Sequence, residues 1–296
     1  MMESVLRIDD EGANPVEGNV VFDLKKSFWN IGMILSALVF APLTFSLESL
    51  ALCLTLTYFT LLIGHSAGMH RMMIHRSFKA VKPVERLLIY IGVLVGMSGP
   101  YGIIRIHDIR DWAQRQSECH DFFSHKRNYF LDVWWQLTSS FNFRHEPKIV
   151  IEPKYQDEKF YQFLEETWRY HQVLLAIVLY YFGGWPFVVW GIFVRVSISI
   201  LGHWSITYFC HNPGPGKWKV KDAVVQASNI PGLGLVTYGE CWHNNHHAFP
   251  ESAKIGLEKG QLDPAWYFIQ GLRYLGLVYD VKLPRAKQLQ DDLERS

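Results

Sequence analysis

The chain has 296 residues, of which 49% are hydrophobic and 19% are charged, and its formal net charge is +1. This composition excludes a disordered or collagen-like chain, and the even charge balance gives no reason to expect a nucleic-acid partner. The four cysteines lie far apart and have neither disulfide nor zinc-finger spacing. The remaining classes are a large soluble enzyme and a membrane protein with a substantial aqueous part.

Long uncharged runs predict four membrane-spanning helices in two hairpins. Residues 27–47 and 49–69 carry no formal charge, and each run is long enough to cross a hydrocarbon core of about 30 Å. A longer apolar block, from Tyr170 to Phe209, is interrupted by the sequence Gly-Gly-Trp-Pro at 183–186, which predicts a turn. We expect the spans at 28–46, 49–69, 168–183 and 186–209.

The basic residues predict the orientation of these spans. Lys and Arg are absent from both hairpin turns and frequent in the other loops, so both termini and both long loops are expected to be cytoplasmic. The membrane would be the inner membrane of a bacterial cell or the endoplasmic reticulum of a eukaryotic one. Residues 87–104 are also uncharged, but they are rich in glycine and are expected to lie on the cytoplasmic face rather than cross.

The predicted fold is therefore an all-α integral membrane protein with four transmembrane helices. Residues 1–27 are expected to form a soluble N-terminal segment, and residues 284–296 a polar C-terminal tail. The membrane domain would span 28–283, with a helical cytoplasmic cap at 70–167 and 210–283.

Eleven of the 13 histidines fall in four clusters, each at a cytoplasmic span end or in a cytoplasmic loop. The clusters are His65, His70 and His75; His107, His120 and His125; His203 and His211; and His243, His246 and His247. Neutral imidazole is the commonest metal-ligating side chain and suits iron, zinc and copper. Three imidazoles within five residues are hard to explain as solvated polarity, so the last cluster predicts a metal site.

Several metal chemistries can be compared with this pattern. The His-Glu-x-x-His motif of helical zinc proteases is absent, and only Glu240 and His243 have the Glu-x-x-His spacing that soluble di-iron bundles use twice. A haem held by His65 and His203 would leave the last cluster unexplained. Many imidazoles at an apolar membrane face favour two oxygen-activating iron ions that remove hydrogen from an unactivated alkyl chain.

Two motifs resemble those of the membrane-bound fatty acid (acyl-CoA) desaturases, in particular the stearoyl-CoA Δ9-desaturase-like group. Residues 239–250, GECWHNNHHAFP, are similar to the family's Gly-Glu-x-aromatic-His-Asn-x-His-His-x-Phe-Pro. Residues 70–80, HRMMIHRSFKA, are similar to His-Arg-x-x-x-His-Arg-x-aromatic-Lys-Ala. The family's Trp-x-x-x-His-x-x-His-His departs here, because Trp112 is followed at those places by Gln116, Cys119 and His120.

The resemblance implies a helical fold with a cytoplasmic cap and a narrow tunnel that leads the acyl chain past a di-iron centre. The implied metal ligands are His70, His75, His120, His211, His243, His246 and His247. Candidates for the missing ligands are His107, His125, His203, His65, Cys119 and Gln116. Residues expected to lie behind the ligands are Glu240, Asp108, Asp111, Asn244 and Thr207. The two aspartates could instead pair only with neighbouring arginines.

The implied activity uses O2 and two external electrons to convert a CH2–CH2 pair of a long-chain acyl group, expected as acyl-CoA, into a cis double bond. The His-Pro-Gly-Gly haem signature of a fused cytochrome b5 domain does not occur, so electrons are expected from a separate ferredoxin, cytochrome b5 or similar reductase. Arg71, Arg76, Lys217 and Lys219 are candidates for contacts to CoA phosphates or headgroups. A membrane hydroxylase of the same superfamily and a haem- or metal-binding electron carrier stay open as alternatives.

Overall fold

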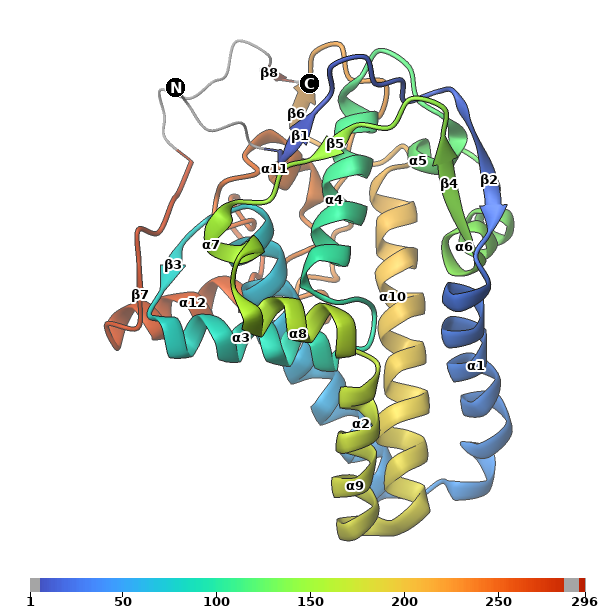
Figure 1. The fold of residues 1–296 in the computed structure, drawn as a ribbon. Helices are drawn as coiled ribbons and strands as arrows, with labels where there is room; N and C mark the ends of the chain where they lie inside the picture. Colours follow the sequence, from blue (N-terminus) through green and yellow to red (C-terminus); the bar gives the residue numbers. More distant parts are fainter. Residues whose placement is uncertain (1–5, 285–292, 296) are drawn as a thin grey trace.

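The computed structural model describes residues 6–284 and 293–295. The described chain is mostly helical, with a stem of long helices and a cap of shorter helices, strands and loops at one end of the stem (Figure 1). Of the predicted polar tail at 284–296, residues 285–292 and 296 lie outside the described residues.

Four helical segments form the stem (Figure 1). They are α1 (Leu24–Phe40), α2 (Leu47–Phe59) continued by the π-helical η2 (Thr60–Ile74), α9 (Tyr170–Val188), and η3 (Val189–Val194) continued by α10 (Arg195–Cys210). The side chain of Asp23 accepts a hydrogen bond from the backbone N–H of Lys26, and this cap begins α1 four residues before the predicted span. The short 3-10 helix η1 (Pro42–Thr44) then turns the chain into α2.

Two helices of the described part are long and apolar enough to cross a membrane, Leu47–Ile74 and Tyr170–Cys210. The second of these contains a break at Gly183 (φ −150°, ψ 15°) and Gly184 (φ 64°, ψ −157°). Gly184 adopts this backbone because it has no Cβ. The chain reverses there, and α9 and α10 lie side by side (Figure 1).

The outward faces of the stem are apolar. Large side chains that are more than half exposed include Phe28, Leu38, Ile177, Tyr181 and Phe182. Inside the stem, Leu179, Ile192 and Val196 form a buried apolar cluster. A continuous apolar exterior around an apolar interior is typical of helices that face lipid.

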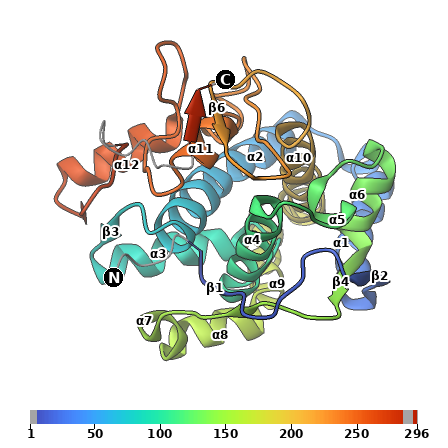
Figure 2. The same ribbon diagram turned by 90° about the horizontal axis from the view of Figure 1, so that it is seen from above.

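The cap is built around α4 (Pro100–Arg115), which lies near the centre of the molecule seen from above, with α3 (Lys82–Leu94) on one side and α10 on the other (Figure 2). Residues 87–104, expected to lie on the membrane face, are divided between these two helices. The other cap helices are α5 (Asp121–Ser124), α6 (Tyr129–Thr138), α7 (Pro153–Gln156), α8 (Lys159–Thr167), α11 (His243–Ala248) and α12 (Pro264–Tyr274).

Four short antiparallel strand pairs join the cap, and the all-α prediction did not include them. They are β1 (Ile8–Asp9) with β5 (Lys148–Ile149), β2 (Gly18–Phe22) with β4 (Ser139–Phe143), β3 (Lys79–Ala80) with β7 (Val278–Tyr279), and β6 (Trp218–Val220) with β8 (Leu293–Arg295). Each pair joins segments far apart in sequence, so no local pattern announces it.

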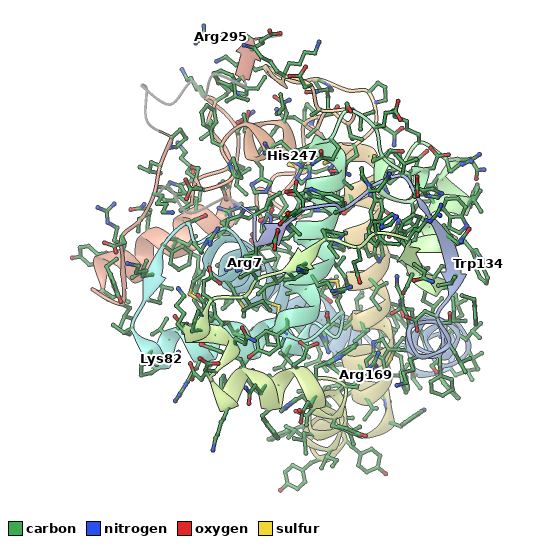
Figure 3. The ribbon with its side chains drawn as sticks, turned by 45° about the horizontal axis from the view of Figure 1, so that its top comes forward. Arg7, Lys82, Trp134, Arg169, His247 and Arg295 are labelled. Atoms are coloured by element: carbon green, nitrogen blue, oxygen red, sulfur yellow. The ribbon has the colours of Figure 1, made fainter. Side chains whose placement is uncertain are left out.

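The N-terminal segment is packed into the cap. Arg7 is 3% exposed and lies in the interior (Figure 3). Its guanidinium donates to the carbonyl oxygens of Ile74 (2.7 Å) and Met73 (2.6 Å) and to Glu152 Oε2 (2.6 Å), and its backbone N–H donates to Asp108 Oδ2 (3.1 Å). Arg7 therefore joins the end of η2 to α4.

We expect Arg7→Ala to lower the free energy of unfolding by about 3–5 kcal/mol, because it leaves buried carboxylates and carbonyls without their cation. Thermal unfolding of the detergent-purified protein measures this as a lower Tm. Arg144→Ala is the matched control, since the Arg144 side chain is 74% exposed and pairs only loosely with Glu17. Equal Tm values for the two variants would contradict the assigned role of Arg7.

Candidate metal centre

Seven histidines gather in two clusters where the stem meets the cap. The first cluster contains His70, His75, His107 and His246, and the second contains His211, His243 and His247. Within each cluster the ring nitrogens that could bind a metal lie within 4.8 Å of one another. Figure 3 shows His247 inside the cap, away from the stem's outer surface.

The π-helical backbone of η2 explains how His70 and His75 reach the same cluster. In an α-helix, side chains five residues apart point about 140° away from each other. Here the His75 N–H donates to the His70 carbonyl (3.0 Å), a five-residue step that returns both side chains to one face. The Nε2 atom of His75 lies 3.2 Å from His70 Nε2 and 3.1 Å from Nε2 of His107, which is carried by α4.

The short helix α11 supplies histidines to both clusters. His243 and His247 are four residues apart and share one face of the helix, where they meet His211 at the end of α10. Their Nε2 atoms are 3.1 Å apart, and both are within 3.4 Å of His211 Nε2. His246 points to the first cluster, with its ring centroid 4.4 Å from that of His75.

These nitrogens fit metal ions. Metal–nitrogen bonds of about 2.0–2.1 Å in a tetrahedron place the ligand nitrogens about 3.3 Å apart, close to the spacing in both clusters. In addition, both ring nitrogens of His246 are buried without a hydrogen-bond partner in the described part of the chain. A metal ion in each cluster would satisfy nitrogens that otherwise face one another.

Burial keeps these imidazoles in the form that binds metal. Desolvation lowers the pKa of His75, His211, His243 and His246 well below 6.5. It also lowers the pKa of His247 to about 3. All five rings are thus neutral at physiological pH, and no proton competes with a cation for their nitrogens.

Carboxylates lie behind two rings of the first cluster. Glu240 Oε2 is 2.8 Å from Nδ1 of His70, and Ser66 donates a hydrogen bond to the other oxygen of Glu240. Asp108 Oδ1 is 3.1 Å from Nδ1 of His107. Burial raises the pKa of the Glu240 carboxyl, but the neighbouring His70 and Arg71 lower it by more. The pKa of Glu240 therefore lies well below its usual range. Carboxylates at Nδ1 orient both rings with Nε2 toward the metal position.

Asp111 lies at the edge of the first cluster. Its Oδ2 lies 3.6 Å from Nε2 of His107, the nitrogen that faces the first cluster, and its Oδ1 accepts from Arg110 Nε (3.2 Å) and Nη2 (3.0 Å). Burial raises the pKa of the Asp111 carboxyl, but the neighbouring His107 and Arg110 lower it by more. The pKa of Asp111 therefore lies well below its usual range. The two alternatives predicted for Asp111, an ion pair with an arginine and a contact to a cluster histidine, therefore both occur.

Three residues predicted from the second motif lie outside both clusters. His120 Nδ1 accepts the backbone N–H of Phe122 (3.1 Å) at the start of α5, and its ring packs on Phe141 with centroids 4.7 Å apart. Gln116 donates to the Trp112 carbonyl (3.3 Å), and burial raises the pKa of the Cys119 thiol to about 11. The prediction that these three residues bind metal is corrected for one reason. Helix α4 ends at Arg115, so Gln116, Cys119 and His120 are not carried by the helix that brings His107 to the first cluster.

His107, and not His120, joins the first cluster from this part of the chain. It lies within α4, four residues before Asp111, so both side chains point to the same face and reach the first cluster. The sequence indicated His107 only as one of six candidates for the missing ligands, because the spacing of four residues to Asp111 does not show which cluster the helix faces.

His65 and His203 contact each other at the wall of a cavity beside the first cluster. Their ring centroids are 5.1 Å apart in edge-to-face contact, so no haem plane separates them. The cavity has a volume of about 450 Å³. Its walls come from α2, η2, α4, α10, the loop before α11 and the start of α11. They include Leu54, Tyr58, Ile198, Val236, His70, His107, Arg110, Thr207 and His243. The centre therefore opens onto a mostly apolar space.

Arg71 is not available to a substrate phosphate. It is 1% exposed. Its guanidinium lies 2.8 Å from Asp263 Oδ1 and donates to the carbonyl oxygens of Ala253 (2.8 Å) and Tyr238 (3.1 Å). Arg76 pairs with Glu152 (2.8 Å) and remains partly exposed. The sequence prediction for Arg71 is wrong because the loop before α12 folds over it.

The remaining predicted residues have structural contacts. Asn244 accepts the backbone N–H groups of Lys217 (2.8 Å) and Trp218 (3.0 Å) and so holds β6 rather than a cluster histidine. Lys217 pairs at the surface with Glu258, and Lys219 is exposed on β6. Thr207 contributes its backbone carbonyl, which lies 2.7 Å from Nδ1 of His211.

Comparison with known proteins defines the class of protein. A family model for fatty acid desaturases matches residues 46–279. The chain is 34% identical over 251 residues to an acyl-CoA C20 Δ5-desaturase of Anemone leveillei, covering 83% of this chain and 78% of the relative. It is 33% identical over 266 residues to an sn-1 stearoyl-lipid 9-desaturase of Anabaena variabilis, covering 87% and 93%.

A further relative is the Δ9 acyl-lipid desaturase 1 of Arabidopsis thaliana, which is 31% identical over 274 residues, with 90% of this chain and 85% of the relative covered. The matched region contains both histidine clusters and both apolar helices. The chain belongs to the fatty acid desaturase family and is an oxidoreductase.

Proposed function

We propose that this chain is an O2-dependent di-iron desaturase that introduces a cis double bond into a long-chain acyl group. The observation that carries the proposal is the position of the two histidine clusters at the wall of an apolar cavity. An alkyl chain gains free energy by entering such a space, and its methylenes then lie beside the centre.

The first and second clusters would each hold one iron ion. Bound iron would supply the activation of O2 and the removal of two hydrogens from adjacent methylenes. The chain's own residues position the reaction: Glu240 and Asp108 orient the rings of His70 and His107, and the apolar walls exclude water and hold the acyl chain. The carbon that reacts is selected by position, not by acid–base chemistry.

We further propose that the stem crosses the membrane four times, with both termini in the cytoplasm. The apolar exterior of α1 and α9, the break at Gly183 and Gly184, and the basic residues of the cap support this topology. The membrane would be the inner membrane in a bacterium or the endoplasmic reticulum in a eukaryote. A separate ferredoxin, cytochrome b5 or similar reductase would bring the electrons to the cap.

Lipid analysis of a host that expresses the chain tests the proposal. We expect a new monounsaturated acyl chain that is absent from a host carrying the empty vector. A hydroxylated chain would instead establish the hydroxylase alternative. The relatives' names include both acyl-CoA and acyl-lipid desaturases. Pulse labelling shows which pool, CoA esters or membrane lipids, receives the double bond first.

A further inference from the structure

We propose that His125, held by Asp132, is the fourth protein ligand of the second cluster. The proposal rests on the proposed metal-dependent function and specifies how one of its metal ions is coordinated. His125 follows the short helix α5, and Asp132 lies in the first turn of α6. Neither residue belongs to the histidine motifs at 70–75 and 243–247.

The second cluster has room for another ligand. It contributes three ring nitrogens, whereas the first contributes four. A metal bound by three imidazoles has an open coordination position that water, substrate or another side chain must fill. His120, the histidine that the second motif predicts, packs against Phe141 and does not reach it.

His125 lies directly beside the second cluster. It is 1% exposed, and its ring stacks on that of His211 with centroids 5.4 Å apart and an interplanar angle of 28°. The centroid distances from His211 to His243 and His247 are similar, 4.8 and 5.2 Å. Asn212, the residue after His211, donates a hydrogen bond to the His125 carbonyl (3.0 Å), which fixes the two segments together.

The ring of His125 has one bound nitrogen and one unpaired nitrogen. Its Nδ1 lies 3.1 Å from both carboxylate oxygens of Asp132, which is also 1% exposed. Its Nε2 is buried and has no hydrogen-bond partner among the residues that the structure describes. A carboxylate on one imidazole nitrogen and a metal ion on the other is the usual arrangement around metal-binding histidines.

If His125 and Asp132 had only a structural role, the buried Nε2 of His125 would lack a partner, and a bound metal ion would provide one. Hydrogen bonding of Nδ1 to Asp132 is satisfied without Nε2, so a buried Nε2 with no partner would cost about 1–3 kcal/mol. The backbone of His125 is also left-handed (φ 55°), a conformation that is uncommon for residues other than glycine. Metal coordination gives a reason for an imidazole at this position.

Counting iron ions in the purified protein tests the proposal. The full chain, in detergent, is stripped with a chelator, titrated anaerobically with Fe2+, desalted and analysed for bound iron. We expect about two ions per chain for the wild type and about one for His125→Asn, because asparagine accepts the left-handed backbone but is too short to reach the site. His120→Asn is the matched control, and we expect it to bind two ions.

A second variant protects the test against misfolding. Asp132→Asn leaves the imidazole in place, and we expect it to weaken binding of the second ion about 10–100-fold without affecting the first. An unchanged iron count in His125→Asn together with unchanged affinity in Asp132→Asn overturns the proposal. Lipid analysis of the wild type reports separately on desaturase activity, so failure of the proposed reaction and failure of this ligand assignment give different results.

Discussion

Replacing His247 with alanine is expected to abolish formation of the unsaturated product. His247 contributes one of the three ring nitrogens in the second cluster, and its Nε2 lies 3.1 Å from Nε2 of His243. Loss of a group that merely orients a metal ligand costs about 10–100-fold in affinity or activity, so loss of a ligand is expected to cost at least about 100-fold. Product is measured by lipid analysis of the expressing host, together with the iron content of the purified variant.

The control for this experiment is His145→Ala. His145 is exposed and lies outside both clusters, so its loss is expected to leave product and iron content at wild-type levels. Product formation by His247→Ala at the wild-type rate would remove the histidine motif at 243–247 from the reaction and would count against the proposed function.

Replacing Arg71 with glutamine is expected to destabilise the protein rather than weaken substrate binding. Arg71 is 1% exposed and is paired with Asp263 and Glu240. Removing one partner of a buried ion pair costs about 3–5 kcal/mol, because it leaves charge buried without compensation. Thermal unfolding measures this loss, and the KM for the acyl substrate of the folded fraction is expected to remain at the wild-type value.

The comparison variant is Arg76→Gln, because the Arg76 side chain is 14% exposed and its partner Glu152 also binds Arg7. We expect a smaller loss of stability there. A raised KM with an unchanged Tm in Arg71→Gln would restore the sequence-based hypothesis that Arg71 contacts the substrate phosphate.

Local patterns in the sequence predicted much of the stem and part of the centre. Uncharged runs and the Gly-Gly-Trp-Pro break indicated the long helices, because helix length and glycine geometry depend on neighbouring residues. The spacing of His243, His246 and His247 indicated metal binding. It could not show that α11 lies between the clusters, with His246 facing one and the other two facing the second.

The tryptophan-led motif at Trp112 is the part of the site that local sequence patterns did not predict. The residues that reach the centre from this part of the chain are His107 and Asp111, on one face of α4. Matching the family's motif at Trp112 selected Gln116, Cys119 and His120, which follow the end of that helix. The choice between these residues depends on how α4 is oriented against η2, which is a property of packing and not of spacing.

The sequence by itself determined the family, the apolar helices and the histidines of the motifs at 70–80 and 239–250, because these are encoded in short, contiguous patterns. Only the tertiary structure decided the place of His107 in the first cluster, the burial of Arg71 and the docking of Arg7 on the end of η2. Each of these contacts joins residues more than thirty positions apart. Such contacts arise when separate elements pack together and buried polar groups find partners, and no local pattern specifies which partner that will be.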